Sequence, residues 1–294
     1  MTRYDHFLRL LVLVTFIIVG LLLTTLGTAV IMLMSGLTLD DVMNLQKAGT
    51  ASLGPGLIRI LLSVQHVFTF ILPGLAFGIV FYKRAWLKGL QLSVEPGWLL
   101  AIAGVFFLVA SYPLVNLGFM VNSTIELPKW ALDFESEAEE TMKLILKMDS
   151  PWIFLANLII IAILPGIGEE LIFRGVLQKQ LGFIFKNKII AIWIAAFIFS
   201  AIHLQFEGFL PRFVLGLVLG YLYYWTGNLW VNMIAHAFNN GIQIILIYAT
   251  GMDISQVDET GSDQLQWWMI PASVSVMYLL YTAIRKYRKP AEDA

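Results

Sequence analysis

The sequence predicts an all-α protein, a polytopic membrane bundle of about eight transmembrane helices. Of its 294 residues, 59% are hydrophobic and only 13% are charged. The mean hydropathy of +0.78 is too high for an ordinary soluble domain. Long apolar runs recur along the whole chain, and no Gly/Ser/Pro-rich linker separates them. We therefore expect a single membrane domain over residues 1–294, with the lipid bilayer as its partner.

The composition also excludes several classes of function. A net charge of -1 argues against a basic surface for nucleic acid, so no nucleic-acid partner is expected. The absence of Cys excludes disulfides, thiolate metal sites and a Cys nucleophile. Any catalysis must therefore use other side chains.

Eight apolar stretches are long enough to be helical membrane crossings. A crossing needs about 20 residues, and an unpaired backbone group in lipid is costly. The stretches are approximately Leu8–Met34, Ile58–Tyr82, Trp98–Met120, Trp152–Phe185, Ile189–Leu204, Phe209–Trp225, Leu229–Tyr248 and Trp267–Ile284.

The charges between these stretches predict the orientation. Lys and Arg concentrate in cytoplasmic loops of membrane proteins. Here they flank one side of the expected bundle, as Arg3, Arg9, Lys83, Arg84, Lys88, Lys186, Lys188, Arg285, Lys286, Arg288 and Lys289. Acidic residues dominate the opposite loops, as Asp133, Glu135, Glu137, Glu139, Glu140, Asp253, Asp258, Glu259 and Asp263. We expect a multi-pass cell-membrane protein with both termini cytoplasmic, and the compact chain without Cys is typical of a bacterial inner-membrane protein.

Ionisable and amide residues interrupt three of the later stretches. An ionised side chain near the bilayer centre costs about 3 kcal/mol or more. The six residues in question are Glu169, Glu170, Arg174, His203, His236 and Asn240. A single polar residue often only bridges helices, but such a set on three helices predicts a functional site. In the second stretch, Gln65 and His66 form a weaker pair that we interpret as a helix bridge.

Helix geometry assigns these residues different places. Glu170 and Arg174 are one turn apart, in the favourable order for an ion pair, whereas Glu169 points elsewhere, toward the bundle interior. His236 and Asn240 share one face of their helix.

Depth along the helices is a second test of the predicted site. Glu169 and His203 are expected at a similar depth, but His236 falls short by about 10 Å, which helix tilt would have to absorb. Pro165, Gly166 and Gly168 are expected to weaken or kink the helix just before the acids.

These residue types are suited to hydrolysis by two routes. In the first, a Glu in an apolar setting acts as general base for a water nucleophile, while His and Asn donate hydrogen bonds to the oxyanion. In the second, His203, His236 and a carboxylate hold a zinc ion that activates the water. The residues permit both, although no His-Glu-x-x-His motif occurs. Ser200 is a weak candidate nucleophile, because no nearby acid would orient His203.

The pattern resembles the signature of the CPBP family of intramembrane proteases, also called the Abi or type II CAAX prenyl endopeptidase family. The family pattern E-E-x-x-x-R, F-x-x-x-H and H-x-x-x-N corresponds to Glu169-Glu170 to Arg174, Phe199 to His203, and His236 to Asn240. The resemblance covers about residues 150–245, which would form the catalytic core. It implies an eight-helix endopeptidase in which Glu169 activates water and the His and Asn residues bind the water or the oxyanion. Its substrate would be a peptide or a membrane protein.

Two other classes of function remain as alternatives. The same residues could form the proton relay of an ion-coupled transporter, although the ionisable residues sit almost entirely in the second half of the chain. A non-catalytic membrane scaffold or immunity protein is the other alternative, and the intact motifs argue against it.

Overall fold

A computed structural model describes residues 2–93, 95–252 and 265–287, and these residues form helices and no strands. Within the described residues the α-helices are α1 (Arg3–Met34), α2 (Leu39–Ala48), α3 (Pro55–His66), α4 (Leu72–Tyr82), α5 (Trp86–Gly89), α6 (Trp98–Ala110), α7 (Tyr112–Asn122), α8 (Lys129–Ile145), α9 (Pro151–Asn157), α10 (Leu164–Glu170), α11 (Lys179–Phe185), α12 (Lys188–Ala201), α13 (Phe209–Thr226), α14 (Leu229–Thr250) and α16 (Met269–Tyr287). Three π-helical segments join some of them, namely η2 (Val67–Ile71), η4 (Leu158–Ile163) and η5 (Leu171–Gln178). Short 3-10 turns lie at η1 (Thr50–Ser52) and η3 (Lys83–Ala85).

The expected polytopic helical bundle is confirmed. Each of the eight apolar stretches is helical over most of its length, and length and composition identify four crossings, at Arg3–Met34, Pro55–Gly89, Trp98–Asn122 and Pro151–Phe185. The next helix, α12, is apolar but shorter, with 14 residues. The last three helices have 18, 22 and 19 residues. They are long enough to span a bilayer, but they carry side chains such as Arg212, His236 and Arg285 that lower their hydropathy.

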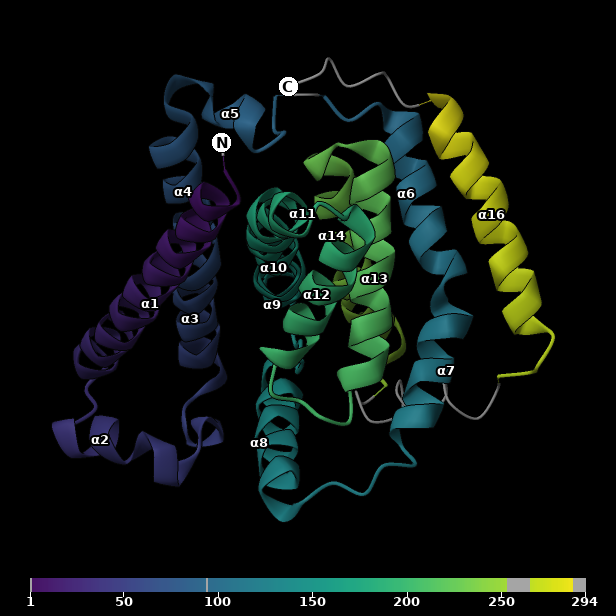
Figure 1. The fold of residues 1–294 in the computed structure, drawn as a ribbon. Coiled ribbons are helices and arrows are strands. Elements are labelled where there is room, and N and C mark those ends of the chain that lie inside the picture. Colours follow the sequence, from purple (N-terminus) through teal and green to yellow (C-terminus); the bar gives the residue numbers. More distant parts are fainter. Residues whose placement is uncertain (1, 94, 253–264, 288–294) are drawn as a thin grey trace.

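The helix that carries the two acids runs through the centre of the bundle. In Figure 1 the continuous run α9–α11 is seen nearly end-on, with α1, α3 and α4 on one side and α12, α13 and α14 on the other. Direct contacts join α10 to α14, α11 to both α1 and α12, and α13 to α7. Helices α6, α7 and α16 complete the far side (Figure 1). The central helix is therefore surrounded by the elements that carry the other polar residues.

Two membrane helices contain a π-helical segment just before a Pro-Gly pair. Both read Ile-Leu-Pro-Gly, at residues 71–74 and 163–166. Proline has no N–H to donate to the carbonyl four residues earlier, and its ring crowds that carbonyl. A π turn widens the helix at this point, and such bulges occur frequently at functional sites. The chain nevertheless stays helical through both prolines. The expected weakening before Glu169 thus takes the form of a wider turn within a continuous helix.

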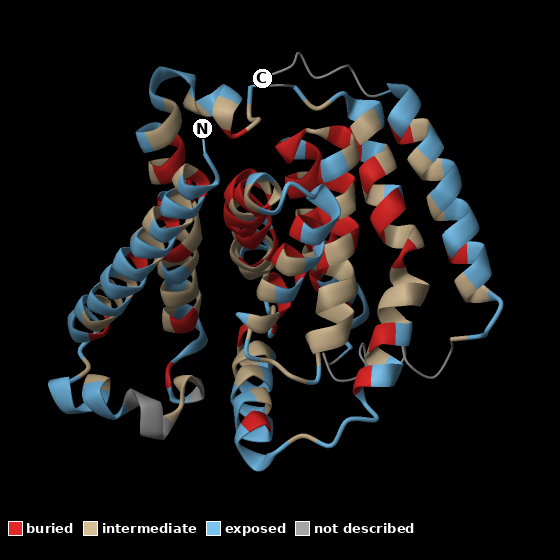
Figure 2. Ribbon diagram, viewed as in Figure 1, coloured by how far each residue is buried: buried red, intermediate tan, exposed pale blue. Residues whose placement is uncertain are grey.

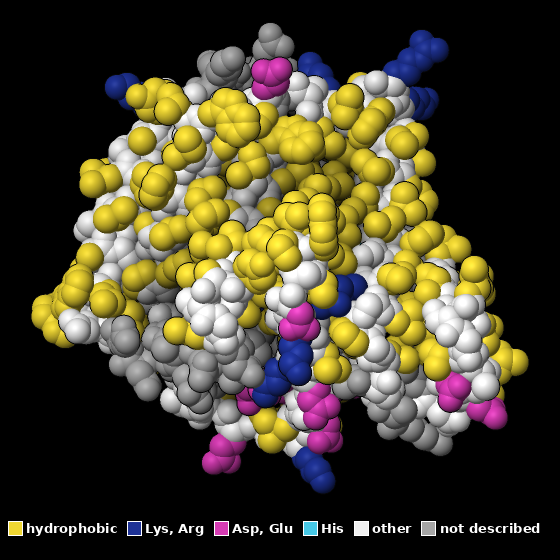
Figure 3. Space-filling view, turned by 180° about the vertical axis from the view of Figure 1, so that it is seen from behind, with side chains coloured by type: hydrophobic (Ala, Val, Ile, Leu, Met, Phe, Trp, Pro, Cys, Tyr) yellow, Lys and Arg dark blue, Asp and Glu magenta, His cyan; other side chains and the backbone are white. Residues whose placement is uncertain are grey.

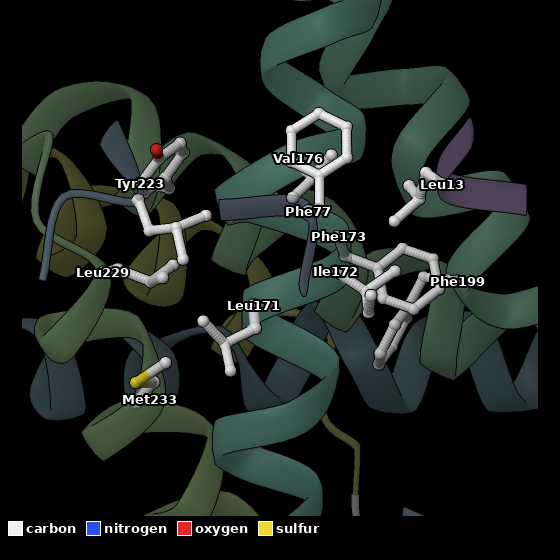
Figure 4. Close-up of a cluster of buried hydrophobic side chains, with 11 residues drawn as sticks. Leu13, Phe77, Leu171, Ile172, Phe173, Val176, Phe199, Tyr223, Leu229 and Met233 are labelled. Atoms are coloured by element: carbon white, nitrogen blue, oxygen red, sulfur yellow. The ribbon is translucent and has the colours of Figure 1, made fainter. Parts of the chain in front are cut away.

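Burial is concentrated around the central helix. Figure 2 shows buried residues gathered in the central helix and in α13 and α14, whereas α1 and α16 are largely exposed. One buried cluster includes Phe173, Val176, Phe199, Leu229 and Met233, and Figure 4 shows its side chains converging from several helices. This apolar packing excludes water from the sides of the site, which strengthens electrostatic interactions inside it.

The outer surface has the pattern of a membrane protein. Figure 3 shows hydrophobic side chains over the middle of one face, Lys and Arg both at its upper edge and in its lower half, and acidic side chains mainly near its lower end. The start of α1, the turn that carries Lys83 and Arg84, and the end of α16 lie at the upper end (Figure 1). Helix α8, which bears the acidic run Glu135–Glu140, lies at the lower end. The expected acids between 253 and 263, and Arg288 and Lys289, lie outside the described residues.

Candidate active site

The carboxylate of Glu170 is the centre of a buried polar network. Arg174 Nη1 donates to Glu170 Oε1 over 2.7 Å, and His236 Nδ1 lies 2.9 Å from the same oxygen. Asn232 Nδ2 donates to Glu170 Oε2 over 3.2 Å. Glu170 is 0% exposed and Arg174 is 1% exposed. The ion pair that the spacing predicts is therefore present, and it is fully enclosed and bonded to two further side chains.

Arg174 is also held by other elements. Its Nη2 donates to the carbonyl oxygen of Gly216 on α13 over 2.9 Å. The guanidinium carbon lies 5.0 Å from the ring centroid of Phe199, a cation–π contact with α12. Arg174 thus ties the central helix to both neighbours, and its charge is balanced by Glu170.

Glu169 has a different environment. It is buried, at 5% exposed, yet no hydrogen bond to its carboxylate occurs among the described residues. The closest basic side chain is His236, whose Nε2 lies 3.8 Å from Glu169 Oε2, beyond direct hydrogen-bonding distance. Arg212 on α13 is near enough to interact electrostatically with Glu169. Of the two neighbouring acids, Glu170 is bonded to three side chains, whereas Glu169 has no hydrogen bond among the described residues.

The glycines before the acids allow helices to approach closely. A Cβ added at Gly166 would lie 2.9 Å from both the backbone nitrogen and the Cβ of Ala237 on α14. One added at Gly168 would lie 2.9 Å from Cβ of Phe70 in η2. Such distances do not fit ordinary packing, so only glycine permits both contacts. These residues bring Glu169 against α14 on one side and against η2 on the other.

His236 reaches the acids although simple depth counting places it too far away. The turn before α14 lies inside the protein, since Asn228 is 2% exposed and Leu229 is 0% exposed. The central helix is also steeply inclined to its neighbours, since Figure 1 shows the run α9–α11 nearly end-on and α13 from the side. The expected mismatch of about 10 Å assumed parallel helices, and this inclination absorbs it.

His203 lies outside a helix, which differs from the expectation that it belongs to a membrane span. Helix α12 ends at Ala201, and Leu204 has a φ of +54° in the loop that follows. His203 Nδ1 lies 2.7 Å from the carbonyl oxygen of Phe199. The ring of Phe199 is 5.2 Å from that of His203 and 5.8 Å from that of His236. His203 is thus held beside the site by the end of α12.

Asn240 and Ser200 both have backbone partners. Asn240 Nδ2 donates to the carbonyl oxygen of Ile161 over 3.2 Å, and Asn239 Nδ2 donates to Asn240 Oδ1 over 3.1 Å. Ser200 Oγ donates to the carbonyl oxygen of Phe209 over 2.6 Å. The Ser200 hydroxyl proton is therefore committed away from His203, which argues further against a serine nucleophile.

Sequence reasoning missed two residues of the network, Asn232 and Arg212. Asn232, His236 and Asn240 follow one another at intervals of four residues, which places them on one face of a helix. This spacing is the signal in the sequence that could have identified Asn232. Arg212 is a charged residue in an apolar stretch. An ionised side chain is as costly in this membrane helix as it is at Glu169, and this cost could have identified Arg212. Both Nη atoms of Arg212 donate to Gln205.

The arrangement does not provide a ready zinc site. The Nδ1 atoms of His203 and His236 face hydrogen-bond acceptors, so Nδ1 carries the proton in the neutral ring. The Nε2 atoms then have a free lone pair, as a metal ligand requires. However, in the described part of the chain no three His, Asp or Glu side chains are grouped so that they could hold a metal ion. No catalytic step is therefore assigned to a metal ion at this site.

Comparison with known proteins agrees with the motifs. Residues 151–242 match the family model described as type II CAAX prenyl endopeptidase Rce1-like. The chain is also similar to YpbD of Bacillus subtilis, named as an uncharacterized protein, with 35% identity over 86 residues, 28% of this chain and 41% of YpbD. The chain thus matches about two fifths of that relative's length. No solved structure matches. The resemblance of the motifs is confirmed, and residues 151–242 carry the type II CAAX prenyl endopeptidase Rce1-like signature of the CPBP family.

Proposed function

We propose that this protein is a membrane-embedded endopeptidase that cleaves a peptide or a membrane-protein substrate. The observation that carries the proposal is the contrast between two adjacent buried acids. Glu170 accepts bonds from three side chains, whereas Glu169 has none among the described residues. Neighbouring carboxylates in such different environments are typical of a division between an acid–base group and a supporting group. The family match over residues 151–242 supports protease chemistry.

The proposed mechanism uses water as the nucleophile. Glu169 takes a proton from the water as the water oxygen attacks the peptide carbonyl carbon, and the carbonyl electron pair moves to oxygen. The tetrahedral intermediate then collapses, and Glu169 returns the proton to the departing amine. Glu170 holds His236 Nδ1, which leaves His236 Nε2 facing Glu169. His203 and Asn240 complete the surroundings of the water and the substrate in this proposal.

The proposed orientation follows from the charge distribution. Basic residues lie at the end where α1 begins, and the acidic helix α8 lies at the opposite end. We therefore propose that both termini are cytoplasmic and that the protein belongs to a bacterial cell membrane. Reporter fusions after Arg3 and after Tyr287 test the orientation, and reporters on opposite sides of the membrane would contradict it.

No specific observation favours the transporter alternative. Two helices carry a Pro-Gly pair, and paired interrupted helices occur in many transporters. Here, however, both helices stay helical through the proline, and only the second carries acids next to it. A scaffold without activity has no evident use for an unbonded, buried Glu169 beside His236.

The proposal is tested by purifying the protein in detergent and incubating it with an unbiased peptide library. Mass spectrometry then identifies cleaved bonds. We expect cleavage by the wild-type protein and none by Glu169→Gln, which keeps the size of the side chain but removes the base. The absence of cleavage by the wild-type protein, or equal cleavage by the variant, would refute the proposed function.

A further inference from the structure

A cavity of about 410 Å³ lies where α1 meets α11, and no residue of the candidate active site lines it. Its lining residues are Thr2, Arg3, His6, Gly182, Phe183 and Lys186. The start of α1 lies at the upper end of the bundle (Figure 1), the end that also carries Lys83 and Arg84. The cavity is therefore a second candidate site, between the first helix and the central run that carries Glu169.

The lining of this cavity is positively charged. Arg3 and Lys186 are exposed, and neither forms an ion pair with a described residue. Thr2 is the N-cap of α1, and the N-terminus of this 32-residue helix adds partial positive charge. The neighbouring acid, Asp5, accepts a hydrogen bond from the backbone N–H of Thr2 over 2.7 Å and does not line the cavity. The cavity therefore suits an anionic group that meets both cations.

His6 adds a hydrogen-bond acceptor to this lining. Its side chain is buried, at 7% exposed, and its ring stacks on Phe183 with the centroids 4.4 Å apart. His6 Nδ1 lies 2.8 Å from Gln180 Oε1, which can only accept, so Nδ1 carries the proton of the neutral ring. Nε2 then has a lone pair, and it forms no hydrogen bond with a described residue. A buried ring held in this way at a cavity suits a ligand that donates from a hydroxyl group.

The surface beside the cavity is apolar and exposed. Phe7 and Leu11 follow Arg3 at intervals of four residues, so the three share one face of α1, and both apolar side chains are exposed. Phe183 on α11 is also exposed. A soluble anion gains nothing from such neighbours, whereas the acyl chains of a lipid pack on them. Basic pockets between membrane helices bind anionic lipid headgroups.

We propose that this cavity binds a phospholipid whose headgroup carries both an anionic phosphate and a hydroxyl group, as phosphatidylglycerol does. The phosphate lies between Arg3 and Lys186, and the hydroxyl donates to His6 Nε2. The acyl chains follow Phe7 and Leu11. An ammonium headgroup is disfavoured, because the two cations repel it.

The bound lipid contacts both α1 and α11, so it holds the first helix against the central one. A ligand that binds only the folded protein stabilises it. The inference does not depend on the proposed endopeptidase function.

The test uses the full-length protein, delipidated in a neutral detergent. Three dioleoyl lipids are titrated: phosphatidylglycerol, phosphatidylethanol, which keeps the charge but lacks the hydroxyl, and phosphatidylethanolamine, which carries an ammonium group. Native mass spectrometry counts the bound lipids, and the rise in melting temperature gives the Kd. Glycerol phosphate is the probe for a soluble anion.

Two double variants make the same change in net charge. Arg3→Gln with Lys186→Gln removes both cations of the cavity. Arg84→Gln with Lys88→Gln is the matched control, because it removes two exposed cations that do not line the cavity. His6→Asn keeps a donor in the position of Nδ1 and removes the acceptor Nε2.

We expect one bound phosphatidylglycerol per chain and a rise in melting temperature of about 4 °C near ten times the Kd. Loss of both cavity cations should raise the Kd by about 30-fold, and the control variant should bind like the wild type. Phosphatidylethanol should bind the wild type about 5-fold more weakly, and His6→Asn should abolish that difference.

The inference is wrong if both double variants lose affinity equally, which would indicate attraction to the surface as a whole. It is also wrong if phosphatidylethanol and phosphatidylethanolamine bind as tightly as phosphatidylglycerol. Displacement of the lipid by an equal concentration of glycerol phosphate would indicate a site for a soluble anion and would overturn the inference too. None of these measurements requires peptide cleavage, so failure of the lipid site and failure of the proposed function are distinguishable.

Discussion

The side-chain amide of Asn240 donates to the carbonyl oxygen of Ile161 over 3.2 Å. Ile161 lies four residues before Pro165, and in a regular helix the N–H of residue 165 would bond to this carbonyl, which a proline cannot do. In the π-helical segment η4 the backbone bonds instead span five residues, as from Leu164 N to Ile159 O, and the Asn240 amide adds a partner from a neighbouring helix. It also connects the second motif residue of α14 directly to the helix that carries Glu169.

This relationship predicts that the stability effect of Asn240 depends on Pro165. Asn240→Ala should lower the melting temperature, because a typical hydrogen bond contributes about 1 kcal/mol to stability. In a Pro165→Ala background the π turn can return to a regular helix, in which the new N–H of residue 165 bonds to Ile161, so the same Asn240→Ala change should cost less. A double-mutant cycle of melting temperatures in detergent measures the coupling.

The exposed Gln243→Ala on the same helix serves as control, and it should have the same small effect in both backgrounds. An equal loss from Asn240→Ala with and without Pro165 would contradict this coupling.

The two neighbouring acids should fail differently when they are replaced. Glu169→Gln should abolish turnover with the melting temperature unchanged, because no hydrogen bond to its carboxylate is lost among the described residues. Glu170→Gln places an amide opposite Arg174 and Asn232, both of which donate. Breaking a buried ion pair costs about 3–5 kcal/mol, so this variant should lose stability first.

The decisive measurement for the acids is melting temperature beside cleavage rate for both variants in the same detergent. Equal loss of activity with an unchanged melting temperature in both would refute the division between a base and a supporting group.

The close approach of α10 to α14 at Gly166 should be as necessary for cleavage as the motif residues are. In Gly166→Ala the new Cβ would press on backbone and side-chain atoms of Ala237, one residue after His236. Separating α10 from α14 would move Glu169 away from His236, so we expect a fall in cleavage rate and in melting temperature. Gly241→Ala is the matched control on α14, since its Cβ would lie 3.6 Å from Ala162, an ordinary contact. Similar behaviour of the two variants would show that close approach at Gly166 is unimportant.

The sequence predicts the helical membrane fold because apolar runs and loop charges are local signals. It also predicts the Glu170–Arg174 pair, because both residues lie on one turn of one helix. It does not predict how His236 meets the acids, since that contact depends on the inclination of the central helix to its neighbours (Figure 1). A residue count along parallel helices cannot detect such an inclination.

Contacts between distant segments are the other part that sequence patterns leave open. His66 reads as a helix bridge because nothing in its own stretch relates it to residues one hundred positions later. Segment η2, which begins at the residue after His66, packs through Phe70 on Gly168, and only the three-dimensional structure shows this contact. Likewise, the roles of Gly166 and Gly168 in close packing require knowledge of which residues face them.

The final prediction concerns a bound zinc ion. One feature of the site favours zinc and another argues against it. The Nε2 lone pairs of His203 and His236 suit a zinc ligand, and they suit equally well an acceptor for the protons of a water molecule. A zinc site needs at least a third protein ligand, and no such group of three is arranged among the described residues. We therefore expect turnover to remain unchanged after dialysis against a chelator, with no increase when zinc is returned. A zinc-dependent protease treated with the same chelator confirms that the treatment works. The opposite outcome would be a loss of turnover on chelation that one equivalent of zinc per chain restores. It would show that the two imidazoles bind zinc and that Glu169 does not activate the water alone.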